Sequence, residues 1–298
     1  MQTIDISHET RYGYAAPVSQ AQHLAHLQPM SDPWQHVLEF SLQIQPPPAQ
    51  QSAGYDPMGN QQLFFSLNQP HRALCVRSRS RVRVAARFEQ MEAAASPLWE
   101  ALRDRLRYEA GARYDPAVEF VQPSPYVPRL EGLRDYGAAS FSPGRPLASG
   151  GLDLMRRIHR DFRFETASTD IDTPLATSFA QRRGVCQDFA HLMIGMLRMQ
   201  GLPARYVSGY LLTIPPPGQE PLVGADASHA WVQLYCPGTP GVPGGWLDLD
   251  PTNDVVPGLG HVRLAVGRDF GDVTPLRGVI RGGGRHSLDV AVMTRVLL

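Results

Sequence analysis

One helical segment constrains the fold of this 298-residue chain more than any other stretch. Gly184 precedes a run of apolar residues at helical spacing, and Gly201 followed by Pro203 is the stop expected just past a helix end. The apolar positions are Leu192, Met193, Met196 and Leu197. The pattern predicts a buried helix that carries Cys186 in its first turn.

Cys186 occupies a place that favours nucleophilic chemistry. Unpaired backbone N–H groups and the positive end of the helix dipole stabilise a thiolate, and they can face an oxyanion that forms beside the sulfur. A free cysteine is more commonly a small buried hydrophobe. This stretch alone leaves both interpretations open.

Charge and cysteine usage narrow the classes of partner and compartment. The 28 basic and 28 acidic residues cancel, which disfavours nucleic acid and anionic membranes as partners. We expect no secretory leader and no membrane-spanning segment, because no stretch has the required length and apolar character. The three cysteines are far apart and odd in number, so we predict no disulfide framework and a cytoplasmic location.

The first 92 residues are dominated by patterns of period two. Apolar and aromatic side chains alternate with polar ones over 4–14, 38–44 and 74–84, as is typical of half-buried strands. The run Pro46-Pro47-Pro48 ends the second of these stretches. We therefore predict an antiparallel β-domain over residues 1–92 with no evident chemistry of its own.

Residues 93–298 mix helical and strand patterns. Helices are predicted near 147–162 and 174–184, besides the one that carries Cys186. Strands are predicted at 204–212, 228–235, 246–250, 262–266 and 288–292. The sequence thus predicts an α+β protein whose second domain spans 93–298, with its last strands within 259–298.

The strands at 228–235 and 246–250 bring polar groups together. Consecutive strands joined by a short loop usually pair antiparallel, and Tyr235 opposite Gly244 would place His229 opposite Asp250. A shift of two residues would place Asp248 there instead. The face that holds His229 is polar, so we expect it to line solvent or a cleft. If the Cys186 helix packs against that face, then thiol, imidazole and carboxylate meet.

Each member of such a set would have a distinct role. His229 would take the thiol proton and later return it to a leaving amine. An aspartate on the far ring nitrogen would fix the tautomer and stabilise the imidazolium. The backbone N–H of Cys186 would contribute to an oxyanion hole.

Four segments resemble motif blocks of the transglutaminase-like superfamily, whose fold is related to papain-type cysteine proteases. They are GVCQDFAHL, ARYVSGYL, SHAWVQLY and GWLDLDPTN, and they lie within residues 150–255. The resemblance implies a helix-borne cysteine packed on an antiparallel sheet, with the first ~90 residues similar to the domain that precedes this core in bacterial members. By motif position, Cys186 would be the nucleophile, His229 the base and Asp250 the third residue. Asp250 matches the third position better than Asp248 does.

The resemblance further implies acyl transfer on an amide or peptide carbonyl through a thioester. A protein or peptide is the expected substrate, and no cofactor or metal is expected. We favour hydrolysis, as by a cysteine protease or amidase, over protein-glutamine transamidation. Side chains that could line the cleft are Gln187, Tyr210, Trp231 and Trp246.

Two other interpretations stay open at this point. A non-catalytic protein-binding module could share the fold, although it would have no reason to retain all three polar residues. A zinc site formed by Cys186, His229 and Asp250 is chemically possible, but no compact ligand pair supports it. Metal analysis would separate a zinc site from a thiol enzyme.

Overall fold

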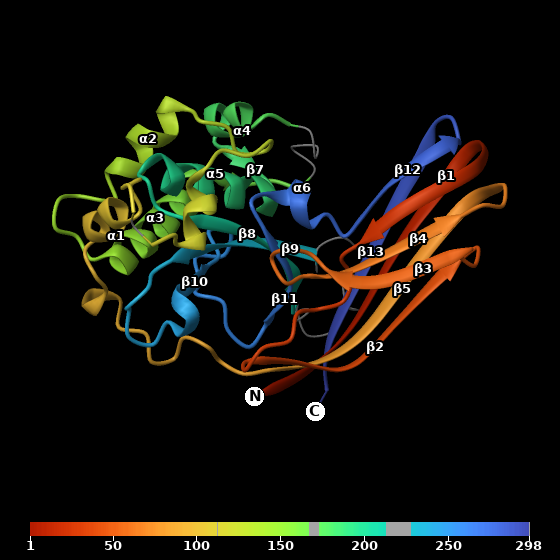
Figure 1. Ribbon diagram of the computed structural model, residues 1–298, viewed down its shortest axis with the longest axis horizontal. Coiled ribbons are helices and arrows are strands. Elements are labelled where there is room, and N and C mark those ends of the chain that lie inside the picture. The colour runs from red at the N-terminus through yellow and green to blue at the C-terminus, as the bar shows by residue number, and fades with distance from the viewer. Residues whose placement is uncertain (112, 167–172, 213–227, 298) are drawn as a thin grey trace.

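The computed structural model describes residues 1–111, 113–166, 173–212 and 228–297 (Figure 1). Helices gather in one lobe and long strands in the other, so the α+β prediction is confirmed. The α-helices are α1 (Trp99–Arg105), α2 (Glu131–Ala138), α3 (Leu147–Asp161), α4 (Leu175–Gln181), α5 (Cys186–Met199) and α6 (Phe270–Val273). Within these described ranges, none of the helices has the length and apolar character needed to cross a membrane.

Two sheets contain most of the strands. The larger one contains β1 (Gln2–Ala25), β2 (Gln35–Gln45), β3 (Gln50–Tyr55), β4 (Gln61–Leu67), β5 (His71–Val84), β12 (Leu276–Gly282) and β13 (His286–Leu297). The smaller one contains β8 (Ala204–Leu211), β9 (Ser228–Tyr235), β10 (Trp246–Leu249) and β11 (His261–Gly267). The short strands β6 (Arg163–Phe164) and β7 (Arg183–Gly184) form a parallel pair beside the helices.

The larger sheet is organised around β1. Its strand order is β2-β5-β1-β4-β3, and β12 and β13 also pair with β1. Thr3 pairs with Leu297, which places the two described ends of the chain side by side (Figure 1). This pairing corrects the predicted domain boundary: residues 276–297, which we grouped with the second domain, complete the N-terminal sheet, whereas β11 does pair with β8 in the smaller sheet.

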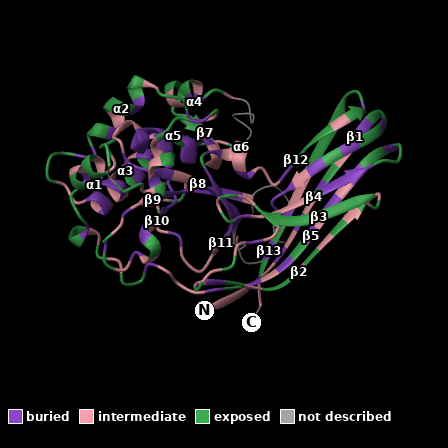
Figure 2. Ribbon diagram, in the orientation of Figure 1, coloured by how far each residue is buried: buried purple, intermediate pink, exposed green. Residues whose placement is uncertain are grey.

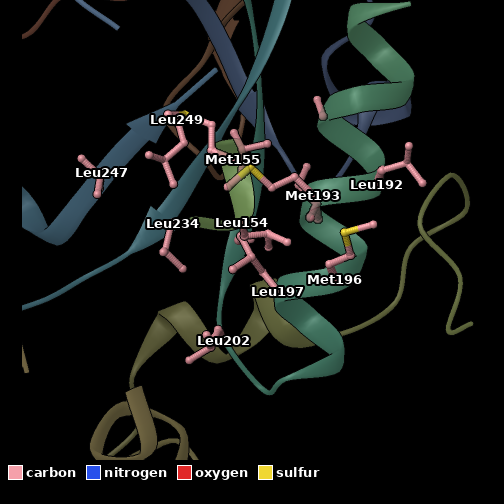
Figure 3. Close-up of a cluster of buried hydrophobic side chains, with 14 of the residues drawn as sticks. Leu154, Met155, Leu192, Met193, Met196, Leu197, Leu202, Leu234, Leu247 and Leu249 are labelled. Carbon is pink, nitrogen blue, oxygen red and sulfur yellow. The ribbon is translucent and has the colours of Figure 1, made fainter. Parts of the chain in front are cut away.

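The smaller sheet has the order β10-β9-β8-β11 and packs against α5. Leu154 and Met155 of α3, Met193 and Leu197 of α5, and Leu234 and Leu249 of the sheet converge in one cluster (Figure 3). Burial of apolar surface of this kind contributes about 25 cal/mol per Å². Most of α5 is buried (Figure 2), so the helix that carries Cys186 is fixed along most of its length.

The two lobes are joined along β11, the edge strand of the smaller sheet. The side-chain amide of Gln35 donates to the carbonyl of Arg263 at 2.7 Å and accepts from its N–H at 2.8 Å. Asn60 makes the same pair of bonds to Val266, at 2.7 and 2.8 Å. These amides satisfy backbone groups that an edge strand would otherwise leave unpaired. The N-terminal sheet therefore holds β11 in a fixed place.

Candidate active site

Cys186 is the first residue of α5, as predicted. The carboxylate of Asp188 reaches back and accepts from the N–H of Val185 at 2.9 Å and from the hydroxyl of Ser178 at 2.8 Å. A side chain at position 184 would lie 2.6 Å from Asp188, so only glycine fits there. The helix start is thereby rigid, and the Cys186 side chain is half-buried.

Helix α5 packs against the apolar face of β9 and not against the polar face that holds His229. The helix belongs to the same apolar cluster as Ala230, Val232 and Leu234, which alternate with His229 along β9. Cys186 nevertheless lies close enough to His229 to help raise the pKa of the imidazole. This contact is possible because Cys186 begins its helix and His229 lies one residue from the start of its strand.

His229 links Cys186 to Asp250. Its Nε2 lies 2.8 Å from Oδ2 of Asp250, and both side chains are buried. The remaining ring nitrogen, Nδ1, is therefore the one left for the thiol. Burial alone would lower the pKa of His229, but its hydrogen bond to Asp250 and the nearby Cys186 outweigh it and raise the pKa to about 10. The site thus favours the imidazolium form at neutral pH.

Asp250 is held by several donors besides His229. Its Oδ1 accepts from the backbone N–H groups of Thr252 and Asn253, at 3.0 and 3.2 Å. Its Oδ2 accepts from the amide of Asn253 at 2.8 Å and from Nε2 of His261 at 3.1 Å. Burial opposes ionisation of Asp250, yet the hydrogen bonds to His229 and His261 keep its pKa well below the usual range.

Asp250 reaches His229 from a turn and not from the strand ladder. Trp246 pairs with Tyr235 and Leu249 pairs with Val232, which is two residues from the predicted register. The strand β10 ends at Leu249, and the chain then turns back so that Asp250 bridges Val255. The predicted face was right because a shift of two preserves it, but the predicted partner positions were wrong.

Asp248, the alternative third residue, has other partners. Its Oδ2 accepts from the indole N–H of Trp231 at 3.2 Å, and its Oδ1 accepts from the side-chain amide of Gln233. Asp248, Trp231 and Gln233 are all buried, so the expectation that this face lines solvent or a cleft was wrong. The face is covered by residues of the N-terminal lobe, among them Met30 and Met58, which pack against the cluster that contains Trp231.

Three of the four side chains expected to line a cleft are packed against other side chains instead. Tyr210 is buried and its hydroxyl bonds Nδ1 of His8 at 3.0 Å. Trp231 is fully buried. Trp246 packs against Phe120 and Tyr235. Gln187 follows Cys186 in the first turn of α5 and is half-buried.

His261 and Asn253 are site residues that the sequence analysis missed. Asn253 lies three residues after Asp250 within the quoted GWLDLDPTN segment, which is a usable signal. His261 is eleven residues further along the chain than Asp250 and carries no local signal. His229, Asp250 and His261 offer ligand atoms within 4.8 Å of one another, a donor set that suits a divalent transition metal. Hydrogen bonds already account for these contacts.

Comparison with known proteins agrees with this arrangement. The family model of the transglutaminase-like superfamily matches residues 144–251, and that of the bacterial transglutaminase-like N-terminal region matches residues 4–83. The uncharacterized protein Rv2569c of Mycobacterium tuberculosis is 39% identical over 290 residues, which cover 96% of this chain and 90% of the relative. The chain belongs to the transglutaminase-like superfamily.

The chain is also similar to one solved structure and, over part of its length, to one named enzyme. The crystal structure of a putative cysteine protease from Cytophaga hutchinsonii superposes with a TM-score of 0.73 at 21% identity, covering 99% of this chain and 91% of the other. It confirms the predicted fold. A protein-glutamine gamma-glutamyltransferase of Pseudomonas aeruginosa is 33% identical over 133 residues, which are 44% of this chain and 19% of that enzyme.

Proposed function

We propose that the protein is a cysteine-dependent acyl-transfer enzyme that acts on amide or peptide carbonyls through a thioester. The observation that carries the proposal is the position of His229, which hydrogen-bonds Asp250 and lies close enough to Cys186 for the thiol to raise its pKa. These are the groups that activate a cysteine nucleophile and return its proton. Membership of the transglutaminase-like superfamily supports a cysteine enzyme.

The proposed reaction has two halves. In the first, the Cys186 thiolate attacks the carbonyl carbon, and the backbone N–H of Cys186 faces the oxyanion that forms. The His229 imidazolium then gives its proton to the leaving amine or ammonia, and a thioester remains on Cys186. In the second half, neutral His229 takes a proton from water, the hydroxide attacks the thioester, and a carboxylic acid leaves. Asp250 holds the imidazole throughout and stabilises its charged form.

Water is the acceptor that we favour for the second half. Cys186 is half-buried, so a thioester on its sulfur would be reachable by solvent. Transfer to an amine instead requires a site that excludes water from the intermediate. Transamidation is the second candidate, because a relative of the central region is named as a protein-glutamine gamma-glutamyltransferase. The proposed substrate class, a protein or peptide, is the same for both.

The first test measures the reactivity of Cys186 with iodoacetamide as a function of pH, by mass spectrometry. We expect alkylation at about pH 6 to be about 100-fold faster than for an ordinary thiol, and this advantage to be lost in His229→Ala. Cys75 provides a control within the same molecule, because it is half-buried and burial raises its pKa. Equal reactivity of the two thiols at low pH would favour the non-catalytic protein-binding module.

The second test separates hydrolysis from transamidation. Glutamine-containing peptides are incubated with the protein in ¹⁸O-labelled water, with and without a primary amine, and the products are identified by mass spectrometry. Hydrolysis places ¹⁸O in the new carboxylate, at a cleaved peptide bond or a deamidated side chain. Dominant incorporation of the amine would replace the hydrolase proposal with the transferase one. Cys186→Ala is the control for product formed without the thiol.

A further inference from the structure

One carboxylate oxygen of Asp250 accepts hydrogen bonds from two histidines. Its Oδ2 lies 2.8 Å from Nε2 of His229 and 3.1 Å from Nε2 of His261. Asp250 is fully buried, and its ionised carboxylate can only accept hydrogen bonds. Nε2 of His261 must therefore carry a proton, which fixes the tautomer of the second imidazole as well as the first.

His261 is itself held rigidly. The indole ring of Trp231 packs edge-on against it, with ring centroids 5.3 Å apart. Trp231 can lie there because position 209 is glycine: a Cβ would approach its ring to 2.4 Å. His261 also begins β11, the strand that is held in place by Gln35 of β2 and by Asn60, which directly precedes β4.

We propose that His261 is a positioning residue of the candidate active site, which holds Asp250 in the orientation that receives His229. The inference rests on the proposed function, since it concerns the same three residues. Two backbone N–H groups hold Oδ1 of Asp250, but its Oδ2 depends on side chains. His261 supplies a donor from a different strand, so Oδ2 is held from two directions. The N-terminal sheet thereby contributes to the site through β11.

The test compares two substitutions at His261. His261→Phe keeps a ring of similar size but removes the donor, whereas His261→Gln keeps an N–H near the position of Nε2. The readout is the rate of Cys186 alkylation by iodoacetamide at about pH 6, because it requires no known substrate. We expect a 10- to 100-fold loss in His261→Phe, which is the range for a hydrogen bond to a charged group, and recovery to within about threefold of wild type in His261→Gln. His36→Phe, the same change at an exposed position of β2, is the matched control.

A double-mutant cycle separates positioning from a general structural effect. If His261 acts through Asp250, then His261→Phe should cause little further loss in an Asp250→Asn background. Full loss in that background would overturn the proposal, and so would wild-type reactivity in His261→Phe. These outcomes differ from failure of the proposed function, in which Cys186 of the wild-type protein reacts no faster than Cys75.

A measurement on the wild-type protein decides the case if His261→Phe does not fold. Protein labelled with ¹⁵N-histidine and treated with a chelator is examined by NMR, and the resonances of His261 are identified by their absence in His261→Gln. We expect the Nε2 signal of a protonated nitrogen bonded to a slowly exchanging hydrogen. A signal typical of an unprotonated Nε2 would overturn the proposal, because that nitrogen could not donate to Asp250.

Discussion

His8 in the N-terminal sheet and His229 in the candidate active site are both buried, yet their pKa values move in opposite directions. His8 bonds the hydroxyls of Tyr210 and Thr10, and burial lowers its pKa to about 4. His229 bonds a carboxylate and lies beside a thiol, and its pKa rises to about 10. Neutral partners satisfy the hydrogen bonds of an imidazole but do not repay the desolvation of its charge. The partner, and not the depth of burial, decides which form of a buried histidine is stable.

The largest expected effect comes from removing the charge beside His229. Asp250→Asn removes the carboxylate that raises the pKa of His229 while burial still opposes the charged form, so the pKa should fall from about 10. Alkylation of Cys186 at about pH 6 should then slow by up to about 100-fold, which is the whole advantage expected over an ordinary thiol. The pH profile of alkylation measures both the shift in pKa and the loss of rate.

Asp248→Asn is the matched control for that variant. It makes the same change two residues away, in a carboxylate that bonds Trp231 and Gln233. The rate of alkylation should stay within about threefold of wild type, since this carboxylate does not hold the imidazole. Equal losses in the two variants would remove the distinction between the aspartates.

A smaller effect is expected from acid on the N-terminal sheet. The folded-state pKa of His8 lies below that of the unfolded chain, so the unfolded chain binds the extra proton first and stability falls as the pH falls from about 6.5 toward about 4. His8 alone should account for about 2 kcal/mol of lost unfolding free energy between about pH 7 and about pH 5. Urea unfolding of wild type and His8→Leu at these two pH values measures the difference.

The unfolding free energy of His8→Leu must depend less on pH than that of wild type if His8 causes the acid sensitivity. His8→Leu is expected to be less stable than wild type at neutral pH, because the hydroxyls of Tyr210 and Thr10 lose a partner. It should nevertheless lose less unfolding free energy than wild type when the pH falls. An unchanged dependence would assign the acid sensitivity to other buried histidines, such as His23 and His191, whose pKa values are lowered in the same way.

The smallest expected effect comes from changing a hydrogen-bond partner of His8 instead of one of His229. Tyr210→Phe removes one of the two neutral partners of His8 and should cost about 1 kcal/mol of unfolding free energy. The loss between about pH 7 and about pH 5 should stay close to the wild-type value, because burial and not the hydroxyl sets the pKa of His8. Urea unfolding at both pH values tests this. A clear change in pH dependence would mean that Tyr210 controls the protonation of His8.

Local patterns in the sequence predicted local structure well. Helix α5 begins at Cys186 because its apolar spacing and its glycine-proline stop act over a few residues. The alternation around Ala230, Val232 and Leu234 predicted their apolar face, which does enter the core. Features of this kind depend on residues that are close in the sequence, so they can be predicted from the sequence.

Features set by distant residues could not be predicted in the same way. The register between β9 and β10 depends on an irregular loop in which Gly244 and Gly245 have positive φ. The polar side of β9 is buried because the N-terminal lobe covers it, which no local pattern reveals. His261 joins the site through a bond from another strand. Each of these facts follows from tertiary pairing and not from propensity.

The central place of β1 has a consequence for the order of synthesis. One side of its first half pairs with β5 and the other with β13, which begins at His286. A ribosome makes β1 long before β13, so the nascent chain carries a strand with an open edge while the whole helical lobe is translated. Open edges recruit other strands, including those of neighbouring chains. Chains released before β13 is made should therefore be the ones that aggregate.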